Sequence, residues 1–218
     1  MASTPNHFLT RRNLLVAGLV AAAAGDASAV WARPGRVVTI LGDSITAGLG
    51  LPAADALPAR LQAALTAAGW PARVRGAGVS GDTTAAGLAR LDFSVQADTD
   101  LCIVALGGND LLQGLDVKAT RANLDRIIKR LKARHIGVLL AGLSAPNAIG
   151  AAYARDFDGV FPALARANAV PLYPNLLDGV GQTPRLNQRD GIHPNAAGVQ
   201  IIAGRLARVV AKALKSRA

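Results

Sequence analysis

The sequence predicts an α/β fold in which a five-stranded parallel sheet is covered by helices on both faces. Short apolar runs alternate with helical stretches along the 218 residues, and this alternation is typical of parallel strands joined by crossover helices. Several runs end in glycine-rich polar segments, as expected where an open sheet carries a site at its carboxyl edge. Apolar residues make up 51% of the composition, enough for one sizeable core.

The elements follow from the hydrophobic pattern in chain order. Strands are expected over residues 37–41, 72–77, 101–106, 136–141 and 169–173. Helices are expected over residues 56–68, 84–91, 118–134, 153–167 and 195–215. The third helix has the clearest period, because Leu124, Ile127, Ile128 and Leu131 recur on one face and leave its basic residues to solvent. With no internal repeat, a single domain over 33–218 is expected.

Residues 1–32 are predicted to be an export signal and are set aside from the fold. Arg11 and Arg12 precede a mildly apolar stretch, residues 14–24, in a pattern typical of twin-arginine signals. The small residues 27–29 indicate cleavage after Ala29, with Ala32 as the alternative position. The apolar stretch is well short of the ~20 residues needed to span a bilayer. We therefore expect a periplasmic or secreted protein.

The composition of the chain limits the classes of binding partner and cofactor that we expect. The net charge is +10 and all acidic residues are aspartate, so transient contact with anionic envelope surfaces is expected. Nucleic acid is disfavoured because the basic residues lack interleaved aromatics. The single cysteine, Cys102, excludes an internal disulfide, and its apolar neighbours indicate an inert buried thiol. No familiar cluster of metal ligands is present. We expect no metal, no cofactor and a monomer.

The block Gly42 to Gly48 indicates nucleophilic chemistry. It follows the first apolar run, and a tight turn there that opens a helix would expose the Ser44 hydroxyl at the sheet edge. His193 is the candidate base, and Asp190, three residues upstream, can reach back to orient its imidazole. His135, between a basic helix and an apolar run, is better explained as a solvated helix end.

Two more blocks follow candidate strands: residues 78–84, which contain Gly81, and residues 107–110, which contain Asn109. Together with the blocks of Ser44 and His193, these segments resemble in order and spacing the four motif blocks of the SGNH or GDSL hydrolase superfamily. The resemblance is closest to its small bacterial thioesterase, lysophospholipase and arylesterase branch, and it covers about residues 36–212.

The resemblance implies a three-layer, flavodoxin-like sandwich with strand order 2-1-3-4-5, which brings the motif loops together at the topological switch point. It implies Ser44 as nucleophile, His193 as general base and acid, and Asp190 as its orienter. The amides of Ser44 and Gly81 and the side chain of Asn109 would form the oxyanion hole. In one departure, Gly76 stands where members of the superfamily often carry asparagine.

Two further aspartates, Asp43 and Asp110, lie beside the glycine-rich turns. Short acidic side chains at such turns commonly accept hydrogen bonds from backbone amides. We therefore expect both to cap amides, and Asp110 to help hold Asn109.

The substrate pocket is expected between residues 111–115 and 144–161, apolar segments with Gly and Pro. The residues expected to line it are Leu111, Leu112, Ile149 and Tyr153. The expected activity is hydrolysis of small to medium acyl esters, including aryl esters, acyl thioesters and lysophospholipids. A carbohydrate O-acetyl esterase is the alternative, which the shortage of aromatic residues disfavours.

The sequence leaves two alternatives outside the hydrolase class. Residues 76–81 form a literal G-x-G-x-x-G pattern, with Asp98 and Asp100 about 20 residues on, as in dinucleotide-binding folds. The preceding run, residues 72–75, is too short and polar for the buried first strand of such a fold. A non-catalytic binding protein of the same fold is the remaining alternative.

Overall fold

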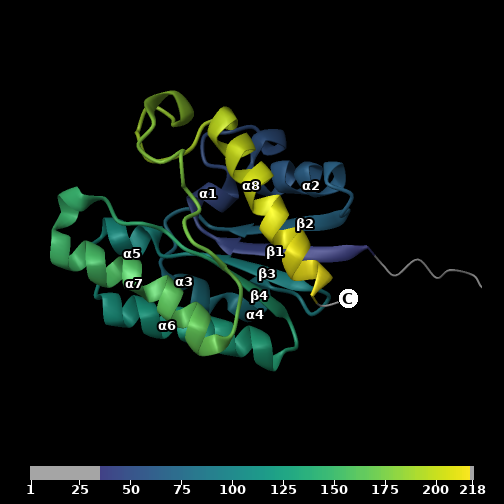
Figure 1. Cartoon of the computed structure of the whole chain (residues 1–218), viewed down its shortest axis with the longest axis horizontal. Helices are drawn as coiled ribbons and strands as arrows, with labels where there is room; N and C mark the ends of the chain where they lie inside the picture. Colours follow the sequence, from purple (N-terminus) through teal and green to yellow (C-terminus); the bar gives the residue numbers. More distant parts are fainter. Residues whose placement is uncertain (1–34, 217–218) are drawn as a thin grey trace, which may run out of the picture. The chain divides into compact units, whose positions relative to one another are not determined.

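The computed structural model describes residues 35–216, and the predicted export signal lies outside the described residues. One sheet of five parallel strands forms the centre of this unit, in the order β2-β1-β3-β4-β5 (Figure 1). The strands are β1 (Arg36–Gly42), β2 (Ala72–Gly78), β3 (Leu101–Ala105), β4 (Gly137–Ala141) and β5 (Leu172–Tyr173). The strand order is the one that the resemblance implied.

Helices cover both faces of the sheet, so the three-layer prediction is confirmed. In chain order they are α1 (Ser44–Ala47), α2 (Leu57–Ala67), α3 (Thr84–Ala89), α4 (Leu91–Ser94), α5 (Gly108–Leu112), α6 (Val117–Ala133), α7 (Ala151–Asn168) and α8 (Ala196–Lys215). Helices α2 and α8 pack together on one face, and α3, α6 and α7 lie on the other (Figure 1). No helix in residues 35–216 is long and apolar enough to cross a membrane.

Burial on both faces explains the composition of the central strands. Every residue of β3 and β4 is buried, as expected for parallel strands covered by helices. Thr39, the polar residue buried in β1, exchanges a 2.8 Å hydrogen bond with the Thr99 hydroxyl. Cys102 is fully buried in β3, where burial raises the pKa of its thiol to about 12. The thiol therefore stays protonated and unreactive, as predicted.

The amphipathic pattern of α6 is confirmed, because Leu124, Ile127, Ile128 and Leu131 are all fully buried. Asp116 caps the start of the helix by accepting a 2.9 Å hydrogen bond from the Lys118 amide.

Two predicted elements differ from the structure. The expected helix 84–91 is divided at Arg90, which ends α3 and precedes α4. The expected strand 169–173 contains only Leu172–Tyr173. Ala169 has a φ of +50° and ends α7 in the left-handed region, so the chain cannot extend until after that turn. Pro174 lacks an amide hydrogen and follows the strand directly, as is common at sheet edges.

Candidate active site

Ser44 lies at the carboxyl edge of the sheet, where it begins α1 directly after β1. The adjacent end of β2 must approach α1 closely for this turn to fit. A Cβ atom at Gly78 would lie 2.4 Å from the Ala47 amide nitrogen, so only glycine permits this packing. The Ser44 side chain is consequently held at a fixed corner, with 8% of the residue exposed.

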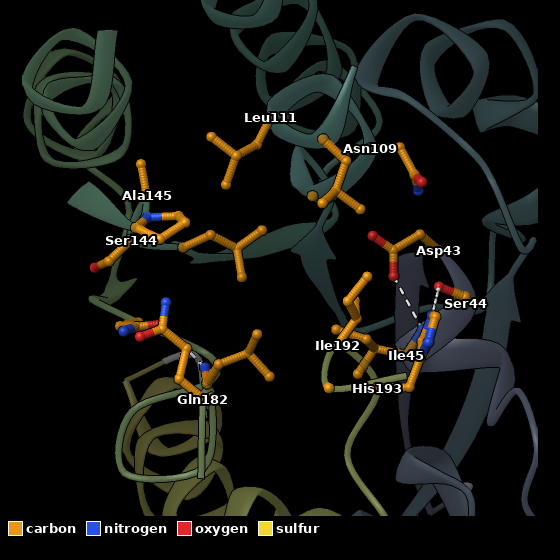
Figure 2. A pocket seen from close by; sticks show the side chains of 18 of the residues that line it. Asp43, Ser44, Ile45, Asn109, Leu111, Ser144, Ala145, Gln182, Ile192 and His193 are labelled. Carbon is orange, nitrogen blue, oxygen red and sulfur yellow. Dashed lines mark hydrogen bonds between the residues drawn. The ribbon is translucent and has the colours of Figure 1, made fainter. Parts of the chain in front are cut away.

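Ser44, His193 and Asp190 form one continuous hydrogen-bonded chain. Ser44 Oγ lies 2.8 Å from His193 Nε2 (Figure 2), and His193 Nδ1 lies 2.6 Å from Asp190 Oδ2. The other Asp190 oxygen accepts the amides of Ile192 at 2.9 Å and of His193 at 3.0 Å. Backbone amides of its own loop thus hold one oxygen of the carboxylate, and the other oxygen contacts the imidazole.

These contacts determine that Asp190 is ionised and which ring nitrogen of His193 carries a proton. Hydrogen bonds from the His193 amide, the His193 ring and the Ile192 amide lower the pKa of Asp190 to about 2. An ionised Asp190 can only accept, so Nδ1 of His193 carries a proton and Nε2 is left to accept from Ser44. This is the tautomer that a general base for Ser44 requires.

Three residues with hydrogen-bond donors, one of them Ser44 itself, line the same cavity. The amides of Ser44 and Gly81 donate to no acceptor within the described chain, and both residues line one cavity. Gly81 has a φ of +85°, a conformation that favours glycine. Asn109 lines the same cavity and donates one Nδ2 hydrogen to the Asp82 carbonyl at 2.9 Å, which leaves its second hydrogen available. The three residues predicted for an oxyanion hole are therefore brought together.

The two turn aspartates cap amides, as predicted. Asp43 Oδ1 accepts the Ile45 amide at 3.0 Å at the start of α1. Buried Asp110 accepts the Thr84 amide at 2.8 Å, and its other oxygen accepts the hydroxyls of Thr84 at 2.5 Å and Thr120 at 3.1 Å. It therefore ties the short helix α5 to α3 and α6 and supports Asn109 through the backbone.

The cavity beside Ser44 has a volume of about 580 Å³. Its apolar walls are formed by Ile45, Leu49, Leu111, Leu112, Leu143, Leu177 and Ile192. Ser144 and Gln182 lie on the side opposite Ser44 and His193 (Figure 2), and neither side chain makes a hydrogen bond within residues 35–216. Leu49, Leu112 and Ile192 are also partly exposed at 47%, 62% and 45%. Apolar side chains thus form much of the cavity wall, and two polar side chains without partners in the described chain lie across from Ser44.

Two of the four pocket predictions need correction. Leu111 and Leu112 line the cavity, but Ile149 and Tyr153 do not. Tyr153 lies along α7 with its ring stacked on Phe157, and its hydroxyl donates to the Leu115 carbonyl at 2.8 Å. It joins α7 to the segment after α5 and borders a separate surface hollow. Ile149 ends the short 3-10 helix Asn147–Ile149 before α7.

Sequence reasoning missed the wall formed by the segment between β5 and the His193 block. Asn175, Leu177, Gly181 and Gln182 of this segment line the cavity, although they carry no periodic pattern. A signal was present: both ends of the segment are tied to the carboxyl edge of the sheet, so its middle must pass over that edge.

Gly76 and Gly78, two of the glycines of the pattern over residues 76–81, permit close packing against neighbouring elements. A Cβ atom at Gly76 would lie 2.8 Å from the Pro58 side chain, so this position faces α2. An asparagine here could not extend without displacing Pro58. The two aspartates of the dinucleotide pattern have structural partners: Asp98 pairs with Arg75, and Asp100 accepts the Val37 amide. Within residues 35–216, no cluster of three or more His, Cys or Asp side chains is placed to hold a metal ion.

Asp43 makes the stability of the fold depend on pH. Burial raises its pKa from the usual 3.8 to about 6, and Asp82 adds to the rise, whereas the Ile45 amide and His193 oppose it. An acid with a raised pKa stabilises the fold at low pH, and this stabilisation is lost as pH rises through the folded-state value. A difference of about two pH units corresponds to ~3 kcal/mol at most.

We expect Asp43→Asn to increase the free energy of unfolding relative to the parent protein by up to ~3 kcal/mol at pH 8 and by little at pH 4. Asparagine keeps an oxygen for the Ile45 amide, so the cap survives. Urea unfolding at both pH values measures the change. The matched control is Asp116→Asn, an exposed cap whose carboxylate is already solvated. A gain at pH 8 no larger than that of the control would contradict the expectation.

A serine, a histidine and a carboxylate hydrogen-bonded in series beside unused amide donors form the arrangement of serine hydrolases, which recurs on unrelated folds. Residues 40–201 match the model of the GDSL-like lipase/acylhydrolase family. The chain is 37% identical to the esterase TesA of Pseudomonas aeruginosa over 163 residues, which cover 74% of this chain and 81% of that protein.

It is also 37% identical to the thioesterase 1/protease 1/lysophospholipase L1 of Escherichia coli, over 78% of this chain and 80% of that protein. Among solved structures, the SGNH-hydrolase family esterase AlinE4 superposes with a TM-score of 0.69 at 46% identity, and covers 83% of this chain and 97% of its own. The chain therefore belongs to the GDSL-like lipase/acylhydrolase family, as its motif blocks predict, and its fold is the SGNH hydrolase fold.

Proposed function

We propose that the protein hydrolyses small to medium acyl esters and thioesters through an acyl-enzyme formed on Ser44. The observation that carries this proposal is the continuous chain from Ser44 Oγ through His193 to Asp190, beside amide donors without other partners. The names of the relatives, an esterase and a thioesterase/lysophospholipase, support the same class of substrate.

Acylation begins when Ser44 Oγ attacks the carbonyl carbon and its proton passes to Nε2 of His193. Asp190 holds the imidazole in place and stabilises the imidazolium that forms. Negative charge develops on the former carbonyl oxygen, and in this proposal the Ser44 amide, the Gly81 amide and Asn109 Nδ2 donate hydrogen bonds to it. His193 then returns the proton to the leaving alcohol or thiol as its bond to carbon breaks.

Deacylation repeats these steps with water as nucleophile. Water takes the position of the departed group, His193 accepts its proton, and the second tetrahedral intermediate forms at the same donors. When it collapses, the carboxylic acid leaves and Ser44 Oγ regains its proton from His193.

The cavity supports an acyl chain of limited length as the specific substrate. Apolar side chains such as Leu111 and Leu143 line the cavity beyond the nucleophile. Ser144 and Gln182 lie on the side opposite Ser44. No Phe, Tyr or Trp of the described chain lines this cavity, so a sugar ring would find no aromatic face there. This supports lipid-like acyl groups over acetylated carbohydrate.

We expect kcat/KM for p-nitrophenyl esters to rise from acetyl toward medium chains and to fall once the chain reaches the polar wall. Each methylene removed from water contributes about 0.8 kcal/mol, a little under fourfold per carbon at best. Steady-state kinetics over a series of acyl lengths measures the profile. Gln182→Leu should move the optimum to longer chains, because it replaces a polar end wall by an apolar one.

The same assay run beside acyl-CoA, lysophospholipid and acetylated polysaccharide tests the alternative. A decline from acetyl onward, with acetate released faster from the polysaccharide than from any lipid ester, would favour a carbohydrate O-acetyl esterase. If product is released from none of these substrates, the result would favour a non-catalytic binding protein of the same fold.

We also propose export through the twin-arginine route, on the basis of Arg11, Arg12 and the small residues before Ala29. Replacing both arginines by lysine should leave unprocessed precursor in the cytoplasm, detectable by fractionation and immunoblotting. Normal processing of that variant, or of the parent protein in a strain without the twin-arginine translocase, would contradict the proposal.

A further inference from the structure

Arg90 joins the ends of two strands to the loop that carries Gly81. It lies between α3 and α4, and 18% of its side chain is exposed. One Nη2 hydrogen is donated to the Gly42 carbonyl at the end of β1, at 2.8 Å. Nη1 donates to the Ala77 carbonyl in β2 at 3.0 Å and to Ser94 Oγ at 2.9 Å. A single planar group thus fixes three segments of the chain.

The fourth contact of Arg90 leads to the candidate oxyanion hole. Its Nε donates to the carboxylate of Asp82, whose side chain is only 12% exposed. The Asp82 carbonyl in turn accepts Asn109 Nδ2 at 2.9 Å, and Asp82 directly follows Gly81. Asp82 therefore lies between two of the three donors that surround the position of the oxyanion.

The contact with Gly42 extends this connection to the nucleophile. The Gly42 carbonyl also accepts the Val79 amide, at 3.2 Å. The end of β1 is therefore joined to the loop of Gly81 both directly and through Arg90 and Asp82. Gly42 precedes Ser44 by two residues. Arg90 consequently contacts the backbone two residues before Ser44 directly, and the loop of Gly81 through the Asp82 carboxylate.

We infer that Arg90 is a positioning residue, which holds the donors of Gly81 and Asn109 at a fixed place relative to Ser44 through Asp82 and Gly42. This inference rests on the proposed esterase function. Donors that stabilise a developing charge must be held within about 0.5 Å of their working position, and a displacement of about 1 Å can cost ~10²-fold in rate. Because the charge exists only in the transition state, the loss should appear in kcat.

Lysine cannot replace arginine at this position. The guanidinium directs four hydrogen bonds in one plane toward acceptors on different segments, whereas an ammonium is a compact charge on a flexible stem. Arg90→Lys therefore keeps the charge beside Asp82 but loses the fixed geometry. The Arg90→Lys variant therefore distinguishes a role in positioning the donors from a role in neutralising the charge of Asp82.

Arg75→Lys is the matched control. Arg75 lies on β2, as does Ala77, and forms two hydrogen bonds with Asp98 at 2.8 and 2.9 Å. Neither residue lines the cavity or contacts the loop of Gly81. The control thus replaces an arginine of β2 that forms a bidentate ion pair, and it leaves the candidate oxyanion donors unchanged.

The test measures kcat and KM for p-nitrophenyl butyrate per active site, with sites counted by exhaustive fluorophosphonate labelling. We expect Arg90→Lys to lower kcat by ~10- to 100-fold, to leave KM within about threefold and to keep the fold by circular dichroism. Arg75→Lys should match the parent protein. In the Asn109→Ala background the same Arg90 change should cost less, because one of the two donors that it positions is gone.

An unchanged kcat per titrated site in Arg90→Lys would overturn the inference, as would an equal loss in Arg75→Lys or a full loss in the Asn109→Ala background. If Arg90→Lys does not fold, Asp82→Asn decides, since it keeps the carbonyl that Asn109 contacts but weakens the link to Arg90. It should lower kcat severalfold at constant KM, and an unchanged kcat overturns the inference. Failure of the parent protein to hydrolyse any ester would instead refute the proposed function.

Discussion

Replacing Ser44 by alanine should lower kcat by at least ~10⁴-fold, because no other hydroxyl lies beside a base in the cavity. Ser44 Oγ lies 2.8 Å from Nε2 of the His193 ring. Turnover of a p-nitrophenyl ester measures the loss, and peptide mass after fluorophosphonate treatment should place the label on Ser44. Ser144→Ala is the matched control, since Ser144 lines the same cavity without a base; it should retain activity within a few fold.

His193→Ala should cause a loss of the same order, since Ser44 would keep its proton. His135→Ala is the corresponding control, because His135 precedes β4 at the amino edge of the sheet. Combining Ser44→Ala with His193→Ala should add little further loss, because the two side chains act as one unit. Labelling of a residue other than Ser44, or a fully active His193→Ala enzyme, would refute these roles.

The strands, the position of Ser44 and the pairing of His193 with Asp190 were predictable because they depend on local signals. Buried parallel strands are continuous apolar runs, and the polar block after each run must lie at the carboxyl edge. Asp190 is three residues from His193, so their contact needs only one loop. The contact between Ser44 and His193 spans 149 residues, so no local signal encodes it, and its prediction depended on the resemblance of the motif blocks.

The walls of the cavity were not predictable in the same way. Ile149 and Tyr153 belong to an apolar segment near the site, but the direction of a side chain on α7 depends on how the helix is rotated against the sheet. Tyr153 faces the segment after α5 instead. Gln182 lies in an aperiodic loop with a φ of +59°, and its position depends on contacts at both ends of that loop.

Arg90 shows the same limit inside a predicted element. The periodic pattern favours one helix over 84–91, whereas the structure divides it at this residue. The contacts of Arg90 reach Gly42 across 48 residues of sequence, and no local pattern encodes a side chain that satisfies carbonyls of two strands. Such residues become visible only when their acceptors are counted in the folded chain.

Asn109→Ala should lower kcat by about 10²- to 10³-fold while KM changes little, because its second Nδ2 hydrogen would act only on the charge of the transition state. Fluorophosphonate labelling of Ser44 should slow in parallel, since the phosphoryl oxygen occupies the same position. Asn123→Ala is the matched control: Asn123 donates its side-chain amide to Thr84 Oγ1 at 3.3 Å but does not line the cavity. That variant should keep the parent kcat.

The two amide donors of Ser44 and Gly81 remain in the Asn109→Ala enzyme, so activity should fall without vanishing. Loss of the contact with the Asp82 carbonyl accompanies the change, and a stability measurement separates this effect, because a looser loop lowers the unfolding midpoint and a missing donor does not. If kcat stayed at the parent value at equal stability, Asn109 would be a structural tie to Asp82, and the oxyanion would rest on the two amides alone.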